Sequence, residues 1–313
     1  MKRVLIIAVA AALAAAAFGA WVYEGQWGTP GSGQGQFNRP GGIAVAPNGD
    51  VYVVEILNNR VQYFTATGSF LGMWSGLSTP VGVAVATNGT VYVAEHYGHR
   101  VQYFTATGSF LGRWGARGSG DGLFNKPEAV AVAPNGNVYV ADGRNHRIQY
   151  FTPTGSFLGK WGSYGTGNGQ FDNPGGVAVA PRGRVFASDH YSSRIQYFTP
   201  TGSFRGKWGS HGEGKGEFEN PRGLALGPNG NVFVADHYND RIQYFTATGS
   251  YLGEWGTRGG GNGRFYYPWD IAFSPTGARV YVADCWNNRV QYFNRKIPAV
   301  SPTSLGRVKA LFR

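Results

Sequence analysis

Short runs of alternating apolar and polar residues recur along the chain, and Gly, Pro or Asn residues separate them. One stretch shows four successive runs, at residues 129–133, 137–141, 147–151 and 156–161. Alternation with a period of two, broken by turn residues, is typical of antiparallel β-strands joined by tight turns. The runs have no helical period between them, so the pattern predicts units of four antiparallel strands.

The motif Arg-Val/Ile-Gln-Tyr-Phe recurs six times and marks the third strand of each unit. It begins at Arg60, Arg100, Arg147, Arg194, Arg241 and Arg289, at spacings of 40 to 48 residues. Common helical repeats have a shorter period of about 33 to 34 residues. Six units of four short strands predict an all-β fold, a six-bladed β-propeller of four-stranded antiparallel blades.

The two ends of the repeated region predict how the ring closes. The sixth unit ends at Phe293 without a fourth strand, whereas residues 22–28 resemble the fourth strand of the fifth unit at residues 251–256. We therefore expect the amino-terminal strand to complete the last blade, because this pairing removes two exposed sheet edges. The predicted propeller spans residues 21–293, and residues 294–313 form a basic C-terminal tail.

The repeat resembles a known family. Its pattern is Gly-x-Phe-x-x-Pro-x-Gly-Val-Ala-Val followed by Val-Tyr-Val-Ala-Asp-x-x-Asn-x-Arg-Ile-Gln-Tyr-Phe. This pattern resembles the NHL repeat, and the resemblance covers residues 21–293. It implies the propeller fold but no single activity. Propellers similar to this one serve as protein-binding, RNA-binding, sensor and lyase domains.

Features present in every unit are expected to build the blades. An acidic residue follows each second strand, and an arginine begins the third strand five residues later, so we expect a charge-assisted pair in each blade. The acidic residues are Glu55, Glu95, Asp142, Asp189, Asp236 and Asp284. A metal-binding ring of these carboxylates is the alternative.

Many of the 50 glycines gather in connections that run 13 residues from a Trp to a Pro, as from Trp27 to Pro40. We interpret these as links between blades, because a strand follows them where a phosphate loop needs a helix. The link from Trp74 to Pro80 runs only 6 residues. It either opens a groove for an elongated ligand or is a neutral deletion.

Function is expected where the units differ, and their variable positions fall in loops on one face. The connection into each first strand and the loop between strands two and three should meet there, giving a polar and aromatic surface. The predicted binding-face residues are His96, Tyr97, Arg144, His190, Tyr191, Arg222, His237, Tyr238, Trp269 and Trp286. Glu128, Tyr266 and Tyr267 lie in the same connections.

We interpret the chain as a monomeric binding scaffold, without a cofactor, that presents this face to a protein, peptide or envelope glycan. The alternative is a metal-dependent lyase or hydrolase on the same face. In that case His96, His190 and His237 would bind zinc through neutral imidazoles. Calcium is the other metal left open. Whether the chain is an enzyme is therefore undecided, with the scaffold preferred.

The family resemblance argues against one specific activity. Peptidylglycine amidating lyases, which are similar to this repeat, place zinc-binding histidines next to the Pro before the first strand. The matching positions here are Gly41, Val81, Glu128, Gly175, Arg222 and Trp269, and none is histidine. Propeller lactonases, a more remote comparison, use irregular carboxylate and Asn ligands for calcium, and the uniform units offer no evident equivalent.

Charge and cysteine content exclude further classes of protein. The formal net charge is +11, but residues 4–293 carry 21 basic and 17 acidic residues, so most of the excess lies at the two ends. So mild an excess in the body argues against nucleic-acid binding. Cys285 is the only cysteine, which excludes an internal disulfide.

The amino-terminal segment predicts the compartment. Lys2 and Arg3 precede an apolar run from Val4 to Phe18, a pattern typical of export signals. Residues 1–20 are thus expected to be a signal peptide or an N-terminal membrane anchor, and an uncleaved anchor would span residues 4–23. We expect a secreted, periplasmic or cell-surface protein. The basic C-terminal tail is a further candidate for membrane contact.

Overall fold

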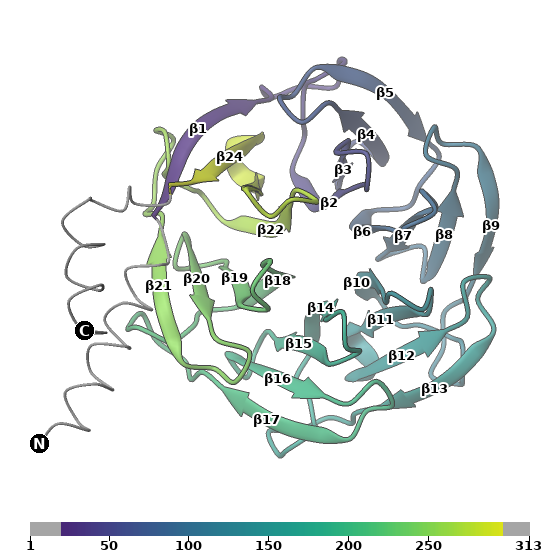
Figure 1. The fold of residues 1–313 in the computed structure, drawn as a ribbon. Helices are drawn as coiled ribbons and strands as arrows, with labels where there is room; N and C mark the ends of the chain where they lie inside the picture. The colour runs from purple at the N-terminus through teal and green to yellow at the C-terminus, as the bar shows by residue number, and fades with distance from the viewer. Residues whose placement is uncertain (1–19, 297–313) are drawn as a thin grey trace, which may run out of the picture.

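Residues 20–296 are described by the computed structural model, and they form a ring of six four-stranded sheets around a central channel (Figure 1). Neighbouring strands in each sheet are antiparallel and follow one another along the chain, except where the ring closes. The expected six-bladed β-propeller is therefore confirmed.

The strands have the following bounds. Blade 1 contains β2 (Pro40–Val45), β3 (Val51–Glu55), β4 (Arg60–Phe64) and β5 (Phe70–Ser75), and blade 2 contains β6 (Pro80–Val85), β7 (Val91–Glu95), β8 (Arg100–Phe104) and β9 (Phe110–Trp114). Blade 3 contains β10 (Pro127–Val132), β11 (Val138–Asp142), β12 (Arg147–Phe151) and β13 (Phe157–Trp161), and blade 4 contains β14 (Pro174–Val179), β15 (Val185–Asp189), β16 (Arg194–Phe198) and β17 (Phe204–Trp208). Blade 5 contains β18 (Pro221–Leu226), β19 (Val232–Asp236), β20 (Arg241–Phe245) and β21 (Tyr251–Trp255), and blade 6 contains β22 (Pro268–Phe273), β23 (Arg279–Asp284), β24 (Arg289–Arg295) and β1 (Trp21–Trp27). Two short 3-10 helices, η1 (Gly143–Asn145) and η2 (Cys285–Asn287), lie in loops.

The ring closes as expected, because β1 pairs with β24 as the outer strand of blade 6. Trp21 pairs with Arg295, so β24 continues two residues beyond the expected boundary at Phe293. The anchor expected over residues 4–23 is wrong for its last three residues, since residues 21–23 belong to β1. The Trp21 ring packs against Phe233 and Phe273. Within residues 20–296, no helix is long and apolar enough to cross a membrane.

Apolar contacts between neighbouring blades form six separate core clusters. Val138 and Val140 of β11, for example, are fully buried against Tyr92 and Ala94 of blade 2. A tryptophan of each of five outer strands also covers a turn glycine of the next blade. Gly155 is such a glycine: its φ is +92°, and an added Cβ would lie 2.6 Å from the Trp114 ring. Glycine fits this position for two reasons, the left-handed backbone and the ring above it.

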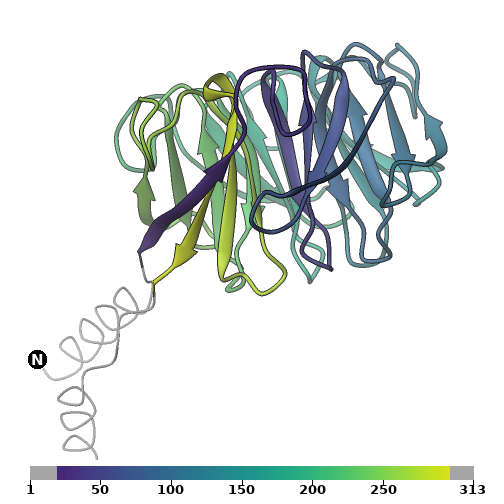
Figure 2. The same cartoon turned by 90° about the horizontal axis from the view of Figure 1, so that it is seen from above.

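The loops that differ between blades gather on one face, which we call the mouth face. There the connection into each inner strand meets the loop between the second and third strands. Backbone hydrogen bonds join the two segments, as from Arg144 N to Asn125 O at 3.0 Å and from His96 N to Thr79 O at 2.9 Å. The tight turns after the inner and third strands lie on the opposite face, as does the Trp21–Arg295 pair (Figure 2). Both ends of the described chain thus lie away from the mouth face.

Candidate functional site at the channel mouth

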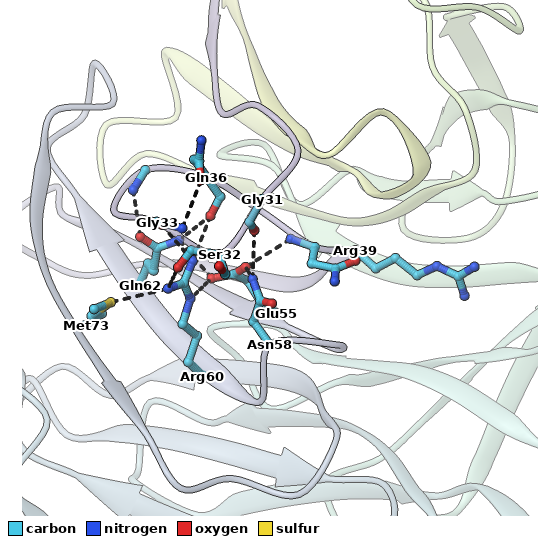
Figure 3. A network of polar contacts seen from close by, with 12 residues as sticks. Gly31, Ser32, Gly33, Gln36, Arg39, Glu55, Asn58, Arg60, Gln62 and Met73 are labelled. Carbon is cyan, nitrogen blue, oxygen red and sulfur yellow. Dashed lines mark hydrogen bonds and ion pairs between the residues drawn. The ribbon is translucent and has the colours of Figure 1, made fainter.

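A repeated polar network holds the loops of the mouth face in place (Figure 3). In blade 1 the buried Arg60 guanidinium forms an ion pair with Glu55. It also donates hydrogen bonds to the carbonyl oxygens of Ser32, Gly33 and Gln36, which belong to the glycine-rich connection. This arginine therefore anchors the link between two blades.

The same acid–arginine pair is present in all six blades, which supports the structural interpretation of these residues. The pairs are Glu55–Arg60, Glu95–Arg100, Asp142–Arg147, Asp189–Arg194, Asp236–Arg241 and Asp284–Arg289. Five of these arginine side chains are at most 10% exposed. Arg100 is 25% exposed, because the short Trp74 to Pro80 connection provides no loop to cover it.

The short connection does not by itself create a groove. A hollow of about 340 Å³ lies beside Met73 and Trp74 in blade 1. A similar hollow of about 370 Å³ lies beside Arg241 and Glu254 in blade 5, where the connection has its full length. Both hollows lie along the repeated arginine and the outer strand, so the deletion is not needed to explain either one.

Hydrogen bonds between neighbouring blades orient the residues that precede each inner strand. Lys126 and Asn173 adopt left-handed backbone conformations, with φ of 55° and 68°. Their N–H groups donate to Nδ1 of His99 and of His146 in the preceding blade, at 3.1 and 3.2 Å. These contacts place both side chains at the wall of a cavity on the mouth face.

Two positions in each blade line the channel mouth: the residue after the inner-strand proline and the residue after the repeated acid. In blade 4 the first position is Gly175, and an added Cβ would lie only 1.5 Å from His190 Nε2. In blade 3 the second position is Gly143, and Glu128 occupies the neighbouring space. In these two blades, a small residue at one position accommodates a large residue at the other.

These side chains and their neighbours enclose a cavity of about 310 Å³ at the mouth. Its polar wall is formed by His96, Lys126, Glu128, Arg144, Asn173 and Arg222. Its apolar wall is formed by Ile56, Val81 and Trp269. A channel of about 280 Å³, lined by the six inner strands, lies along the axis. The mouth is thus charged on one side and apolar on the other.

Glu128 and Arg222 form an ion pair in the wall of this cavity that is too long for a hydrogen bond. Glu128 Oε2 lies 3.9 Å from Arg222 Nη1, and Glu128 Oε1 lies 3.4 Å from His96 Nδ1. The Arg222 guanidinium lies over the Trp269 ring, 3.8 Å from its centroid. Burial raises the pKa of Glu128, whereas Arg222, Arg144 and Lys126 oppose that rise.

The three predicted histidines are neutral at pH 7; His190 and His237 are buried, whereas the His96 side chain is 17% exposed. Burial lowers the pKa of His96 to about 4, with Lys126 and Arg222 adding to the effect, and it lowers the pKa values of His190 and His237 well below the usual value of a histidine. His190 is 2% exposed, and its Nε2 has no hydrogen-bond partner in the described chain. Within residues 20–296 no three His, Cys, Asp or Glu side chains form a group able to hold a metal ion. The structure therefore does not bring His96, His190 and His237 together as metal ligands.

The predicted tyrosines and Trp286 form an exposed aromatic surface around the mouth. Tyr97, Tyr191, Tyr238 and Trp286 are between 43% and 59% exposed. Cations lie over three of these rings: Lys126 over Tyr97 at 4.8 Å, Arg144 over Tyr191 at 6.0 Å and Arg39 over Trp286 at 4.4 Å. We call Tyr97, Tyr191, Tyr238 and Trp286 the aromatic rim.

The structure divides the predicted face residues into two groups and leaves His190 outside both. His96, Tyr97, Arg144, Tyr191, Arg222 and Trp269 line the mouth cavity. His237, Tyr238 and Trp286 belong to an aromatic cluster of blades 5 and 6 that includes Tyr267. His190 is buried above Gly175 and fills space at the mouth.

The predicted set of site residues omitted Glu128, which lies at the centre of the polar wall. The available signal was its position, because it is the only acidic residue among the six that follow the inner-strand prolines. Lys126 and Asn173 were also omitted. Burial raises the pKa of Cys285 to about 12, so its thiol is protonated and unreactive at neutral pH.

Comparison with known proteins assigns the repeat. The NHL repeat model matches residues 37–64, 77–104, 124–151, 218–245 and 265–293. Blade 4, at residues 171–198, has the same strands and the same Asp189–Arg194 pair. No curated protein sequence matches the chain.

Several solved structures share the fold at low sequence identity. A structural genomics protein of unknown function from Bacteroides thetaiotaomicron is 18% identical, with a TM-score of 0.70 over 88% of this chain and 76% of that chain. A gluconolactonase from Xanthomonas campestris is 16% identical, with a TM-score of 0.65 over 89% of this chain and 98% of that one. A streptogramin B lyase is 14% identical, with a TM-score of 0.62 over 88% and 97%. These similarities extend to the fold alone, whereas the repeated motif, its five matches to the family model and the six blades identify the chain as an NHL-repeat β-propeller.

Proposed function

We propose that the chain is a binding scaffold that presents its mouth face to a protein, peptide or glycan partner. The observation that carries this proposal is the aromatic rim, whose four side chains are 43% to 59% exposed on loops of blades 2, 4, 5 and 6. Tyrosine, tryptophan and arginine are enriched where proteins bind one another, because they offer large contact areas with a polar end. The rigid ring beneath holds these loops in fixed positions.

A metal-dependent lyase or hydrolase on the same face is the second candidate. Two structural neighbours of this architecture are described as a streptogramin B lyase and a gluconolactonase. The buried Glu128 beside His96 is the one acid–base contact at the mouth that favours this candidate. The described residues do not supply the three grouped metal ligands that it needs, so the scaffold remains the proposal.

We also propose that the protein acts outside the cytoplasm. Lys2, Arg3 and the apolar run that follows them support this proposal. Ala20, where the described chain begins, hydrogen-bonds through its carbonyl to Lys296 N at 3.0 Å on the face opposite the mouth. A segment that holds the protein at Ala20 would leave the mouth face directed away from the point of attachment.

The test is direct binding of the full chain to peptide and glycan arrays, followed by measurement of the dissociation constant of the best ligand. Tyr191→Ala and Tyr238→Ala should each weaken binding about tenfold, because truncating a central aromatic side chain in an interface typically costs 1 kcal/mol or more. Phe110→Ala is the matched control, since Phe110 is an exposed aromatic residue of the outer strand β9. Fractionation of the cells that supply the protein tests the compartment.

Two results would contradict the scaffold. One is unchanged affinity in both tyrosine variants; the other is an equal loss in Phe110→Ala, which would show that binding does not use the mouth face. Recovery of the protein in the cytoplasmic fraction would overturn the proposed location without affecting the binding result.

A further inference from the structure

The mouth cavity contains a buried charged pair whose hydrogen-bonding groups are unused. Glu128 is 8% exposed, and within residues 20–296 neither its carboxylate nor the Arg222 guanidinium makes a hydrogen bond. Nε of Arg222 is buried and has no partner there. An unsatisfied buried donor is costly, and the Arg222 side chain is 18% exposed, so a ligand that reaches its Nη groups can provide an acceptor.

The stacking of Arg222 leaves its donors available. The guanidinium lies over the Trp269 ring at 3.8 Å, and the N–H groups of a guanidinium point outward in its own plane. A planar acceptor with two oxygens can therefore approach its edge and accept two parallel hydrogen bonds. A carboxylate has this shape, and such a bidentate contact is among the stronger polar interactions in proteins.

The charges around the cavity favour an anion with a single negative charge. Arg222, Arg144 and Lys126 are cationic, Glu128 is the one acidic residue in the wall, and His96 is neutral. Glu128 opposes a group with two negative charges, such as phosphate, more strongly than a group with one. The apolar wall of Ile56, Val81 and Trp269 offers a surface for the rest of the ligand.

We propose that the mouth cavity binds the carboxylate of an apolar organic acid, with the carboxylate on the edge of Arg222 and the apolar part against Trp269, Val81 and Ile56. This inference rests on the proposed function, because it names the chemical group that the same face recognises. Two sources provide this group: a small free acid, or the C-terminal carboxylate of a peptide. The cavity of about 310 Å³ is large enough for a side chain with its carboxylate.

Glu128 gives the site a characteristic pH dependence. Burial raises the pKa of this carboxyl, and a protonated Glu128 would no longer repel the bound carboxylate and would become a hydrogen-bond donor. Binding of a carboxylate should therefore tighten as the pH falls and Glu128 takes up a proton. Glu128→Gln should remove this dependence and bind more tightly at pH 8.

The experiment uses the full chain and isothermal titration calorimetry with two matched probes, N-acetyl-L-phenylalanine and N-acetyl-L-phenylalaninamide. We expect the acid to bind at least tenfold more tightly than the amide, because only the acid forms the charged bidentate contact. Arg222→Met should weaken binding of the acid at least tenfold and leave the amide unchanged. Arg184→Met is the control, since Arg184 also lies over an aromatic ring, that of Tyr197, but on the opposite side of the propeller.

Further probes separate the two sources. A peptide that ends in phenylalanine with a free C-terminus should bind more tightly than the small acid if the natural ligand is a chain end, and the same peptide with an amidated C-terminus should lose this binding. It should bind more weakly if the cavity is built for a free acid. Inorganic phosphate is the third probe, and equal or tighter binding of phosphate would overturn the proposal by showing a general anion site.

Failure of this inference is distinguishable from failure of the scaffold. Equal binding of acid and amide, no binding of either, or equal effects of Arg222→Met and Arg184→Met would overturn the carboxylate site. Capture of a partner that depends on Tyr191 and Tyr238 would still support the scaffold. Thermal unfolding of each variant confirms that a loss of binding is not a loss of the fold.

Discussion

Two ion pairs in this propeller use the same chemical groups but have opposite environments. In blade 3 Arg147 donates four hydrogen bonds: one to Asp142 at 2.8 Å and three to carbonyl oxygens of the adjoining connection, at 2.7 to 2.9 Å. At the mouth Arg222 lies 3.9 Å from Glu128 and donates no hydrogen bond within residues 20–296. Both carboxylates are buried.

The difference separates groups that build the molecule from groups that remain available to a ligand. A buried guanidinium with all its acceptors inside the protein has little capacity for anything else. A buried guanidinium without acceptors adds little to stability and is already desolvated for binding. In this repeat, the structural arginines are those whose N–H groups all have acceptors inside the protein. The candidate binding arginine is the one whose N–H groups have none within residues 20–296, although its burial and charge are similar.

The largest expected effect comes from the saturated pair. Arg147→Met should lower the free energy of unfolding by about 3–5 kcal/mol, because it leaves Asp142 buried without its cation and releases three loop carbonyls. Arg222→Met should lower it by less than about 1 kcal/mol, since it breaks no hydrogen bond in the described chain. Urea unfolding followed by tryptophan fluorescence measures both.

Equal losses in the free energy of unfolding of these two variants would contradict this distinction, because they would show that Arg222 stabilises the fold as much as Arg147 does. Arg184→Met again serves as the control, since it removes one charge outside the mouth together with one hydrogen bond, to Ala247 O at 3.1 Å. Arg222→Met must also be tested for carboxylate binding, since we expect this variant to be stable and yet defective in binding.

The fold was predictable from the sequence because every local signal agrees with it. The Arg-Val/Ile-Gln-Tyr-Phe motif gave the third strand of each blade, and β12 has the expected bounds, Arg147–Phe151. The inner strand β10 begins at Pro127, two residues earlier than its apolar run indicated, because Pro127 pairs with Asp142 across a register shift. A local irregularity of this kind has no signature in the alternation of residues.

The candidate site was only partly predictable. Comparison of the blades identified the face and all four residues of the aromatic rim, since the variable loop positions are visible in the sequence. Glu128 was not selected, because its importance depends on its distances from Arg222 and His96, which lie in other blades. Conversely, His190 was selected for its chemistry, but it fills the space above Gly175. The spacing of residues within one blade does not predict which side chains of different blades contact one another at the channel mouth.

A smaller effect is expected from Asp270, a carboxylate in the channel wall that has hydrogen bonds but forms no ion pair within residues 20–296. Its oxygens accept from Ile43 N at 3.1 Å and from Ile271 N at 2.8 Å. Burial raises its pKa from 3.8 to about 7, so the fold favours the protonated form. The stabilisation from this group is therefore complete below pH 3.8 and is lost as the pH rises through about 7.

Asp270→Asn imitates the protonated form and should remove this pH dependence. Between pH 5 and pH 8 the wild-type protein should lose about 1–2 kcal/mol of stability relative to the variant, a value reduced for the solvent that enters the channel. Thermal unfolding of both proteins at each pH gives the difference directly, and all other titrating groups cancel. If the stability of both proteins changed in parallel with pH, the two hydrogen bonds alone would be enough to stabilise the ionised carboxylate. The absence of a cation at Asp270 would then not destabilise the fold.

An effect smaller than that of Asp270 is expected within the repeated network itself, in blade 2. Arg100 contacts Glu95 through Nε at 3.1 Å and Nη2 at 3.0 Å, but in the described chain it donates to no loop carbonyl. Its side chain is 25% exposed, so water already satisfies part of the guanidinium. Arg100→Met should therefore lower the free energy of unfolding by only about 0.5–1 kcal/mol. If urea unfolding showed a loss as large as that of Arg147→Met, the ion pair would carry the stabilisation. A small loss would show that the stabilisation by the repeated arginine comes from the three carbonyl contacts, which the short Trp74 to Pro80 connection cannot supply. Arg100 would then be intermediate between the structural arginines and Arg222.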